Sequence, residues 1–249
     1  METVFLNKRA LVIGGTGGIG RKVAIGLAKR GADVTVHGGS SGRRLDSTLE
    51  EIEKAGGKGK GFLLPIQGPS AADEILRLFA LPGTAVSVPD ILVCAWGPFK
   101  QENPEKTGRE IWQTMTDTNL VFPGTLVSLC LQDMITREWG RILLFGGTNT
   151  DTIRGFLTTT AYSAAKTALG VIAKSVAKAA GGRGVTCNVI CPGLTDTEYC
   201  ADEQLRYNRD KSPAGKPLLP AEVAAAALSV LENPVINGAI VPVDRGLTI

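Results

Sequence analysis

Short apolar segments alternate with longer amphipathic segments along almost the whole chain, and this alternation most strongly constrains the fold. The apolar segments span residues 10–14, 33–39, 61–66, 90–97, 140–147, 184–193 and 239–244. They are short and rich in apolar residues, as is typical of buried parallel strands. Helices are predicted at 19–31, 45–57, 71–79, 107–139 (as two helices), 161–180 and 220–231. The pattern predicts an α/β fold in which one doubly wound domain, residues 1–249, has a seven-stranded parallel sheet with helices on both faces.

One stretch, residues 194–217, fits no regular element and follows a predicted strand. In open α/β sheets, ligands bind outside the carboxyl ends of the strands. We therefore interpret this stretch as a substrate lid, with a solvated excursion as the alternative.

Composition excludes several classes of partner. The 27 basic and 24 acidic residues give a net charge of only +3, without the long basic clusters that nucleic-acid binding requires. The sequence shows neither a membrane-spanning apolar run nor a signal-peptide pattern, so we expect a cytoplasmic protein that does not bind a membrane. The five cysteines form no CxxC pair, and His37 is the only histidine, so no metal site is expected.

A glycine-rich turn joins the first predicted strand to the first predicted helix. Glycines let a backbone approach a diphosphate, and a helix amino terminus offers it unpaired N–H groups. The alternative is an ordinary tight turn, but the flanking strand and helix favour a dinucleotide site. Its expected contacts are Gly14, Thr16, Gly17, Gly18, Ile19 and Gly20.

The end of the second strand indicates which dinucleotide binds. An acidic side chain there would bond the ribose hydroxyls of NAD, and this chain has none. Hydroxyl and guanidinium groups suit the additional phosphate of NADP. NADP(H) is therefore favoured over NAD(H), with His37, Ser40, Ser41 and Arg43 as contacts. Alternatively, Arg43 and Arg44 only begin a solvated helix.

Tyr162 and Lys166 are one helical turn apart at the start of the helix predicted after the fifth strand. They therefore share a helix face, and we expect the ammonium to lower the pKa of the phenol from its usual value of about 10. Such a phenol can donate a proton to a carbonyl oxygen. A tyrosine and a lysine at this spacing are common in helices, so the position after a nucleotide-binding sheet gives the pair its meaning.

The glycine spacing at 14, 18 and 20, together with Tyr162 and Lys166, resembles the short-chain dehydrogenase/reductase family from Lys8 to Asp244. The resemblance implies a Rossmann domain and hydride transfer to or from a nicotinamide. It also implies that Lys166 bonds the nicotinamide ribose and that the backbone of Asn119 holds a water of the proton relay.

The resemblance implies further cofactor contacts in three loops. The loop after the sixth strand would meet the nicotinamide through Pro192, Gly193, Leu194, Thr195 and Thr197. Where the family tends to have NNAG after the fourth strand, this chain has Cys94, Ala95, Trp96 and Gly97, of which the last three are expected cofactor contacts. The adenine-facing position is occupied by Gln67 and Gly68.

The family serine that bonds the substrate oxygen has no counterpart here. Thr148 is our expected hydroxyl donor, and Asn149 and Thr150 are alternatives. Phe156 and Tyr199 are expected to line an apolar substrate pocket.

These features predict an NADPH-dependent reductase that converts a carbonyl to an alcohol, with Tyr162 as proton donor. The layout resembles that of the family's 3-oxoacyl carrier-protein reductases, which suggests a 3-oxoacyl thioester among small-molecule substrates. The resemblance also implies a homo-oligomer, either a dimer or a tetramer. The alternative is an NADP(H)-binding sensor or structural subunit with little catalysis, because the serine is missing.

Overall fold

The computed structural model describes residues 3–80, 88–200 and 202–247. Its seven strands form one sheet in the order β3-β2-β1-β4-β5-β6-β7, and every neighbouring pair is parallel. The strands are β1 (Arg9–Ile13), β2 (Asp33–Gly38), β3 (Lys58–Leu63), β4 (Ile91–Cys94), β5 (Gly140–Phe145), β6 (Val185–Pro192) and β7 (Ile240–Val243). The doubly wound Rossmann fold predicted from the alternating pattern is confirmed.

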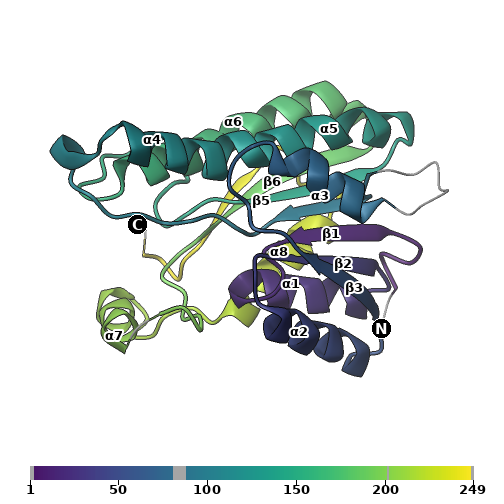
Figure 1. The fold of residues 1–249 in the computed structure, drawn as a ribbon, viewed down its shortest axis with the longest axis horizontal. Coiled ribbons are helices and arrows are strands. Elements are labelled where there is room, and N and C mark those ends of the chain that lie inside the picture. Colours follow the sequence, from purple (N-terminus) through teal and green to yellow (C-terminus); the bar gives the residue numbers. More distant parts are fainter. Residues whose placement is uncertain (1–2, 81–87, 201, 248–249) are drawn as a thin grey trace.

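Helices cover both faces of this sheet, with α1, α2 and α8 on one side and α3 to α6 on the other (Figure 1). The helices are α1 (Gly18–Lys29), α2 (Gly42–Lys54), α3 (Ala71–Phe79), α4 (Arg109–Thr116), α5 (Phe122–Thr136), α6 (Thr160–Ala180), α7 (Asp202–Lys211) and α8 (Pro220–Glu232). Parallel neighbouring strands need such crossover connections, because the chain must return to the same end of the sheet before each new strand.

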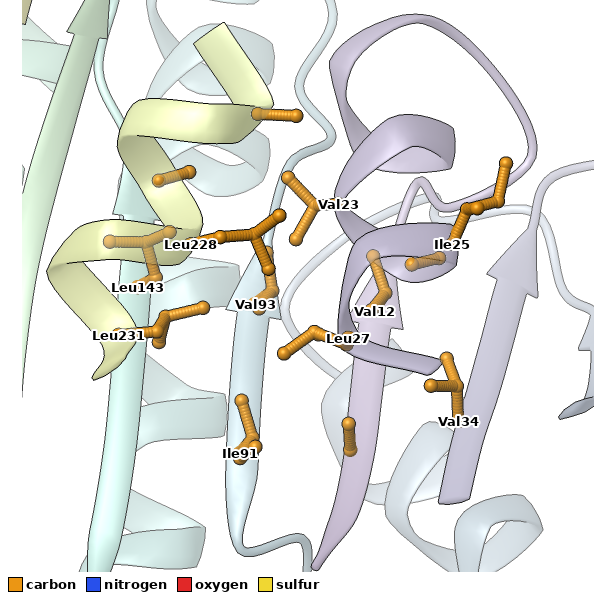
Figure 2. Packing of buried hydrophobic residues seen from close by; sticks show 14 of the residues in the cluster. Val12, Val23, Ile25, Leu27, Val34, Ile91, Val93, Leu143, Leu228 and Leu231 are labelled. Atoms are coloured by element: carbon orange, nitrogen blue, oxygen red, sulfur yellow. The ribbon is translucent and has the colours of Figure 1, made fainter. Parts of the chain in front are cut away.

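Alternate residues of each central strand enter two separate hydrophobic clusters. In β1, Val12 belongs to the cluster beneath α1 and α8, whereas Leu11 and Ile13 belong to the cluster beneath α3, α5 and α6. Figure 2 shows side chains of α1 and α8 meeting above β1, β4 and β5. Burial on both faces explains why these strands are continuously apolar.

The sheet reverses its winding between β1 and β4, where a ligand crevice is expected. Ile13 pairs with His37 on one side and with Cys94 on the other, so β1, β2 and β4 end at the same level. Three loops therefore meet at this edge of the sheet.

Two sequence-based expectations about elements were wrong. Part of the 194–217 segment is helix α7, although residue 201 lies outside the described residues. β3 is an edge strand with mostly exposed side chains rather than a buried one.

The predicted break in 107–139 is a π-helical turn, Asp117–Val121, between α4 and α5. Across the described residues, no helix combines the length and apolarity needed to span a membrane.

Candidate active site

The glycine turn after β1 presents the amino terminus of α1 to an anion, and in this structure the Glu198 carboxylate accepts from the Gly18 N–H there. Gly14 and Gly18 have φ of +75° and +50°, where side chains are strained, and a Cβ at Gly14 would lie 2.8 Å from the Cβ of Trp96. The N-cap Gly17 contributes no side-chain hydrogen bond. The backbone N–H groups of the turn and the positive end of the helix dipole fit a dinucleotide diphosphate.

His37 supports this turn from behind and does not face the crevice. Its side chain is 1% exposed; Nδ1 accepts a hydrogen bond from the Gly14 N–H at 3.3 Å, and Nε2 lies 2.8 Å from the Leu64 carbonyl oxygen. This arrangement requires the neutral ring, with Nε2 as donor. Burial lowers the pKa of His37, which keeps the ring neutral. We predicted that His37 contacts the cofactor, but in the structure it supports the glycine turn instead.

A cleft of about 460 Å³ lies above the glycine turn. The turn, the loop after β2, the loop after β4 and the segment after β6 all contribute to it. Its lining residues are Gly14, Thr16, Gly17, Gly18, Ile19, Gly39, Ser40, Ser41, Arg44, Ala95, Trp96, Gly97, Thr197 and Tyr199. Half of the predicted cofactor contacts therefore line one cleft.

Arg44, rather than the predicted Arg43, is the cation of this cleft. Arg44 follows the N-cap Ser41 of α2, whose hydroxyl accepts a hydrogen bond from its N–H, whereas Arg43 is exposed outside the lining. Gln67, the predicted adenine-facing residue, is also exposed and does not line the cleft.

β2 ends at Gly38, where a Cβ would lie 2.6 Å from the methyl carbon of Thr16. The close approach of Thr16 explains why this position is glycine.

Tyr162 and Lys166 lie at the carboxyl end of β5, in the first turns of α6. Lys166 Nζ donates a hydrogen bond to the Phe145 carbonyl oxygen at 2.9 Å and lies 5.9 Å from the centre of the Tyr162 ring. The Tyr162 hydroxyl points at Gly147, 2.9 Å from where a Cβ would be. The edge of the Phe99 ring packs on the phenol, with centroids 5.0 Å apart.

Burial sets the protonation of this pair. It raises the pKa of Tyr162 to about 12, with a smaller contribution from the Cys191 thiol, and lowers the pKa of Lys166 to about 8. The expectation that Lys166 lowers the pKa of the phenol is therefore wrong, because desolvation has the larger effect. At neutral pH the phenol carries its proton.

Asn119 is fully buried in the π-helical turn before α5. Its Nδ2 donates to the Pro98 carbonyl oxygen at 3.0 Å, while no donor among the described residues reaches its buried Oδ1. Gly97 lies beside both Asn119 and Lys166, because a Cβ there would be 3.0 Å from Lys166 Nζ. The turn thus brings Asn119 to the same corner of the site as Lys166.

The loop after β5 uses its hydroxyls internally. Thr148 Oγ1, our expected donor to the substrate, donates to the Pro192 carbonyl oxygen at 3.1 Å. Thr150 Oγ1 accepts from the Gly147 N–H at 2.8 Å and donates to the Gly147 carbonyl oxygen at 3.0 Å, which closes the turn. Asn149 adopts a left-handed φ of +62°. Both threonine hydroxyls thus donate to backbone carbonyls, while Gly147 lies beside the Tyr162 hydroxyl.

The two predicted substrate-pocket residues lie in different places. Tyr199 lines the cleft, but Phe156 lines a separate hollow of about 810 Å³ with Ile153 and Val171. Sequence reasoning also missed Phe99 and Glu198. Phe99 follows the carboxyl end of β4, an edge where ligands bind, so its position was a usable signal. Glu198 contacts a residue far away in sequence, and no local pattern indicates that.

Fold and site together define an oxidoreductase of the doubly wound, dinucleotide-binding class. Residues 8–208 match the family model described as short chain dehydrogenase, and the chain belongs to the short-chain dehydrogenase/reductase family.

Relatives match along nearly the full length. The 3-oxoacyl-(acyl-carrier-protein) reductase FabG of Vibrio cholerae is 30% identical over 96% of this chain and 97% of its own length. The 2-dehydro-3-deoxy-D-gluconate 5-dehydrogenase of Pseudoalteromonas atlantica is 27% identical over 96% and 95%. A crystal structure of a 3-oxoacyl (acyl-carrier-protein) reductase from Agrobacterium tumefaciens C58 with NADP bound is 26% identical, with a TM-score of 0.87 over 97% and 95% of the two chains.

Proposed function

We propose that this protein is an NADPH-dependent reductase that converts a carbonyl group to an alcohol, with Tyr162 as proton donor. The observation that carries the proposal is the protonated Tyr162 phenol beside Lys166 at the carboxyl end of β5. When bound, the nicotinamide supplies hydride to the carbonyl carbon. Tyr162 then delivers its proton to the carbonyl oxygen, and the Lys166 ammonium stabilises the negative charge left on the phenol oxygen.

The protonation states favour reduction over oxidation. Reduction starts from a neutral phenol, which is the state that burial stabilises. Oxidation of an alcohol would start from a phenolate that burial disfavours. The neutral phenol is therefore the form that the proposed reduction uses.

The loop after β2 supports NADPH over NADH. No carboxylate stands at Gly38, where it would repel a 2′-phosphate, while Ser40, Ser41 and Arg44 line the adjacent part of the cleft. A guanidinium and two hydroxyls can hold a phosphate through charge-assisted hydrogen bonds. The relative from Agrobacterium tumefaciens was crystallised with NADP bound.

A 3-oxoacyl thioester is the substrate class that we propose. Two of the relatives are 3-oxoacyl-(acyl-carrier-protein) reductases, and exposed Arg206 and Arg209 on α7 would suit an acidic carrier. A third relative is a dehydrogenase of a sugar acid, so a small hydroxy-acid or keto-acid is the comparison substrate for any assay. The exposed apolar side chains Leu129 of α5 and Val171 of α6 support the proposed homo-oligomer.

One observation favours a second candidate, an NADP(H)-binding sensor with little catalysis. Glycine stands at position 147 beside the phenol, and Phe99 packs on the ring. A substrate oxygen would thus receive fewer hydrogen bonds than a serine at this place would allow.

A ketone and thioester panel with Tyr162→Phe tests the proposal. NADPH absorbance should fall with at least one carbonyl substrate, and Tyr162→Phe should lower that rate by about 10² to 10⁴ while NADPH binding persists. Tyr207→Phe, an exposed tyrosine on α7, is the matched control and should keep the wild-type rate. NADPH binding without turnover of any panel member would favour the sensor instead.

A further inference from the structure

A carboxylate from the segment after β6 lies on the open amino terminus of α1. The Gly18 N–H donates to Glu198 Oε1 and Oε2 at 2.9 and 3.1 Å, although the two residues are 180 apart in sequence. Since Gly17 provides no capping side chain, this carboxylate takes the place of a cap. A helix amino terminus stabilises negative charge, so the contact is favourable as it stands.

The next residue engages the second phosphate-binding group of the cleft. The Arg44 guanidinium lies over the Tyr199 ring, 4.7 Å from its centre. Tyr199 also packs on Gly17, because a Cβ there would lie 2.9 Å from the ring carbon that bears the hydroxyl and 2.6 Å from Glu198 Oε1. Two adjacent residues therefore occupy both the α1 amino terminus and Arg44.

We infer that Glu198 and Tyr199 form a strap that competes with the dinucleotide for these two groups, which makes Glu198 a determinant of cofactor affinity. The inference rests on the proposed function, which places the diphosphate at Gly18 and the 2′-phosphate at Arg44. One N–H cannot serve a carboxylate and a diphosphate at once, and the two anions would repel each other. The strap must therefore leave before the dinucleotide can bind.

Competition of this kind has a definite effect on affinity. The apparent dissociation constant equals the intrinsic constant divided by the fraction of molecules with the site open. A carboxylate on a helix amino terminus stabilises the closed arrangement enough to leave only a minority open. Removing the carboxylate should raise the open fraction and tighten NADPH binding by about two- to fivefold.

Three variants separate this effect from general electrostatics. Glu198→Ala removes the contact, and Glu198→Gln keeps one acceptor oxygen but no charge, so its effect should be intermediate. Glu203→Ala removes the same charge from an exposed position in the following helix α7 and touches no glycine of the turn. NADPH titrations followed by nucleotide fluorescence should show tighter binding for Glu198→Ala and wild-type affinity for Glu203→Ala. Equal affinity of Glu198→Ala and wild type, or equal gains in Glu198→Ala and Glu203→Ala, would overturn the inference.

A second measurement does not depend on any cofactor. Arg206 and Arg209 are exposed trypsin sites on the helix that follows the strap. If Glu198 holds the strap on α1, limited trypsin digestion at these sites should be faster in Glu198→Ala than in wild type. Identical digestion rates would show that Glu198 holds nothing in place, and would overturn the inference even if no variant bound NADPH. Absence of NADPH binding in wild type and in Glu198→Ala alike would instead overturn the proposed function.

Discussion

The hydroxyl of Tyr162 occupies the space that a side chain at Gly147 would need, 2.9 Å from the Cβ position. The position of the Tyr162 phenol therefore depends on residue 147 being glycine. The phenol can reach this point only because no side chain lies there, and the Phe99 ring packs against the phenol edge to face. Where the resemblance leads one to expect a serine hydroxyl, this site has the proton donor itself.

Substitution of Gly147 should therefore act through Tyr162. Gly147→Ala should displace the phenol and lower the rate of carbonyl reduction by about tenfold, because small misplacements of a reacting group are costly. Gly147→Ser causes the same displacement but adds a hydroxyl donor, so it should be faster than Gly147→Ala. Steady-state rates with near-ultraviolet circular dichroism as a folding control would check this, and an unimpaired Gly147→Ala would contradict it.

Arg44 should set the preference between the two dinucleotides. Arg44→Ala should weaken NADPH binding about tenfold or more relative to NADH, since a charge-assisted bond to phosphate is lost. The ratio of the two affinities matters because loss of Arg44 also loosens Tyr199, which affects both cofactors alike. Arg43→Ala, outside the cleft lining, is the control and should leave the ratio unchanged. An unchanged ratio in Arg44→Ala would rule out Arg44 as the phosphate contact.

The rate of carbonyl reduction should fall as the pH rises through about 8. The pKa of Lys166 is lowered to about 8, so its ammonium is lost above that pH, whereas Tyr162, with a pKa of about 12, keeps its proton. Loss of the ammonium removes the charge that stabilises the phenol oxygen after proton transfer. A pH–rate profile should show this decline in wild type and in Lys174→Met, an exposed lysine of the same helix. Lys166→Met should be slow and lack the decline near pH 8.

His37 should make cofactor binding and stability sensitive to acid. Burial lowers its pKa below 6.5, so the unfolded chain takes up the proton first and the free energy of unfolding decreases as the pH falls below 6.5. Protonation would also remove the acceptor for the Gly14 N–H. His37→Asn keeps an acceptor near Nδ1 and should bind NADPH without this acid sensitivity, while His37→Phe should bind it about tenfold more weakly. Denaturant titrations and NADPH titrations between pH 5 and 8 would test both effects; equal acid sensitivity of wild type and His37→Asn would contradict the assignment.

The sheet and most helices were predictable because local patterns determine them. β1, β4 and β5 are short apolar strands buried on both faces, and their sequences show it directly. Helix α7 was missed because most of its residues are polar and no apolar repeat at helical spacing marks it. Its acidic first turn and basic last turn were nevertheless signals that suit a helix dipole.

The sequence predicted which motif residues form the site, but not the pKa of Tyr162 or the contact between Glu198 and Gly18. Motif positions indicated the glycine turn, Tyr162 and Lys166, and the structure places all of these at one edge of the sheet. The pKa of Tyr162 depends on how much water the whole fold excludes, which no motif encodes. The contact of Glu198 with Gly18 likewise depends on the path of a segment between two distant elements.

The π-helical turn between α4 and α5 fixes the rotational phase of one helix relative to the other. There the Phe122 N–H bonds to the Asp117 carbonyl oxygen five residues earlier, so the coil contains one residue more than a continuous α-helix would. Deleting that extra residue would let α4 and α5 continue as one regular α-helix with their faces unchanged. It would also remove the widened turn that holds Asn119 beside Gly97 and Lys166. The extra residue therefore serves the site rather than the packing of α5.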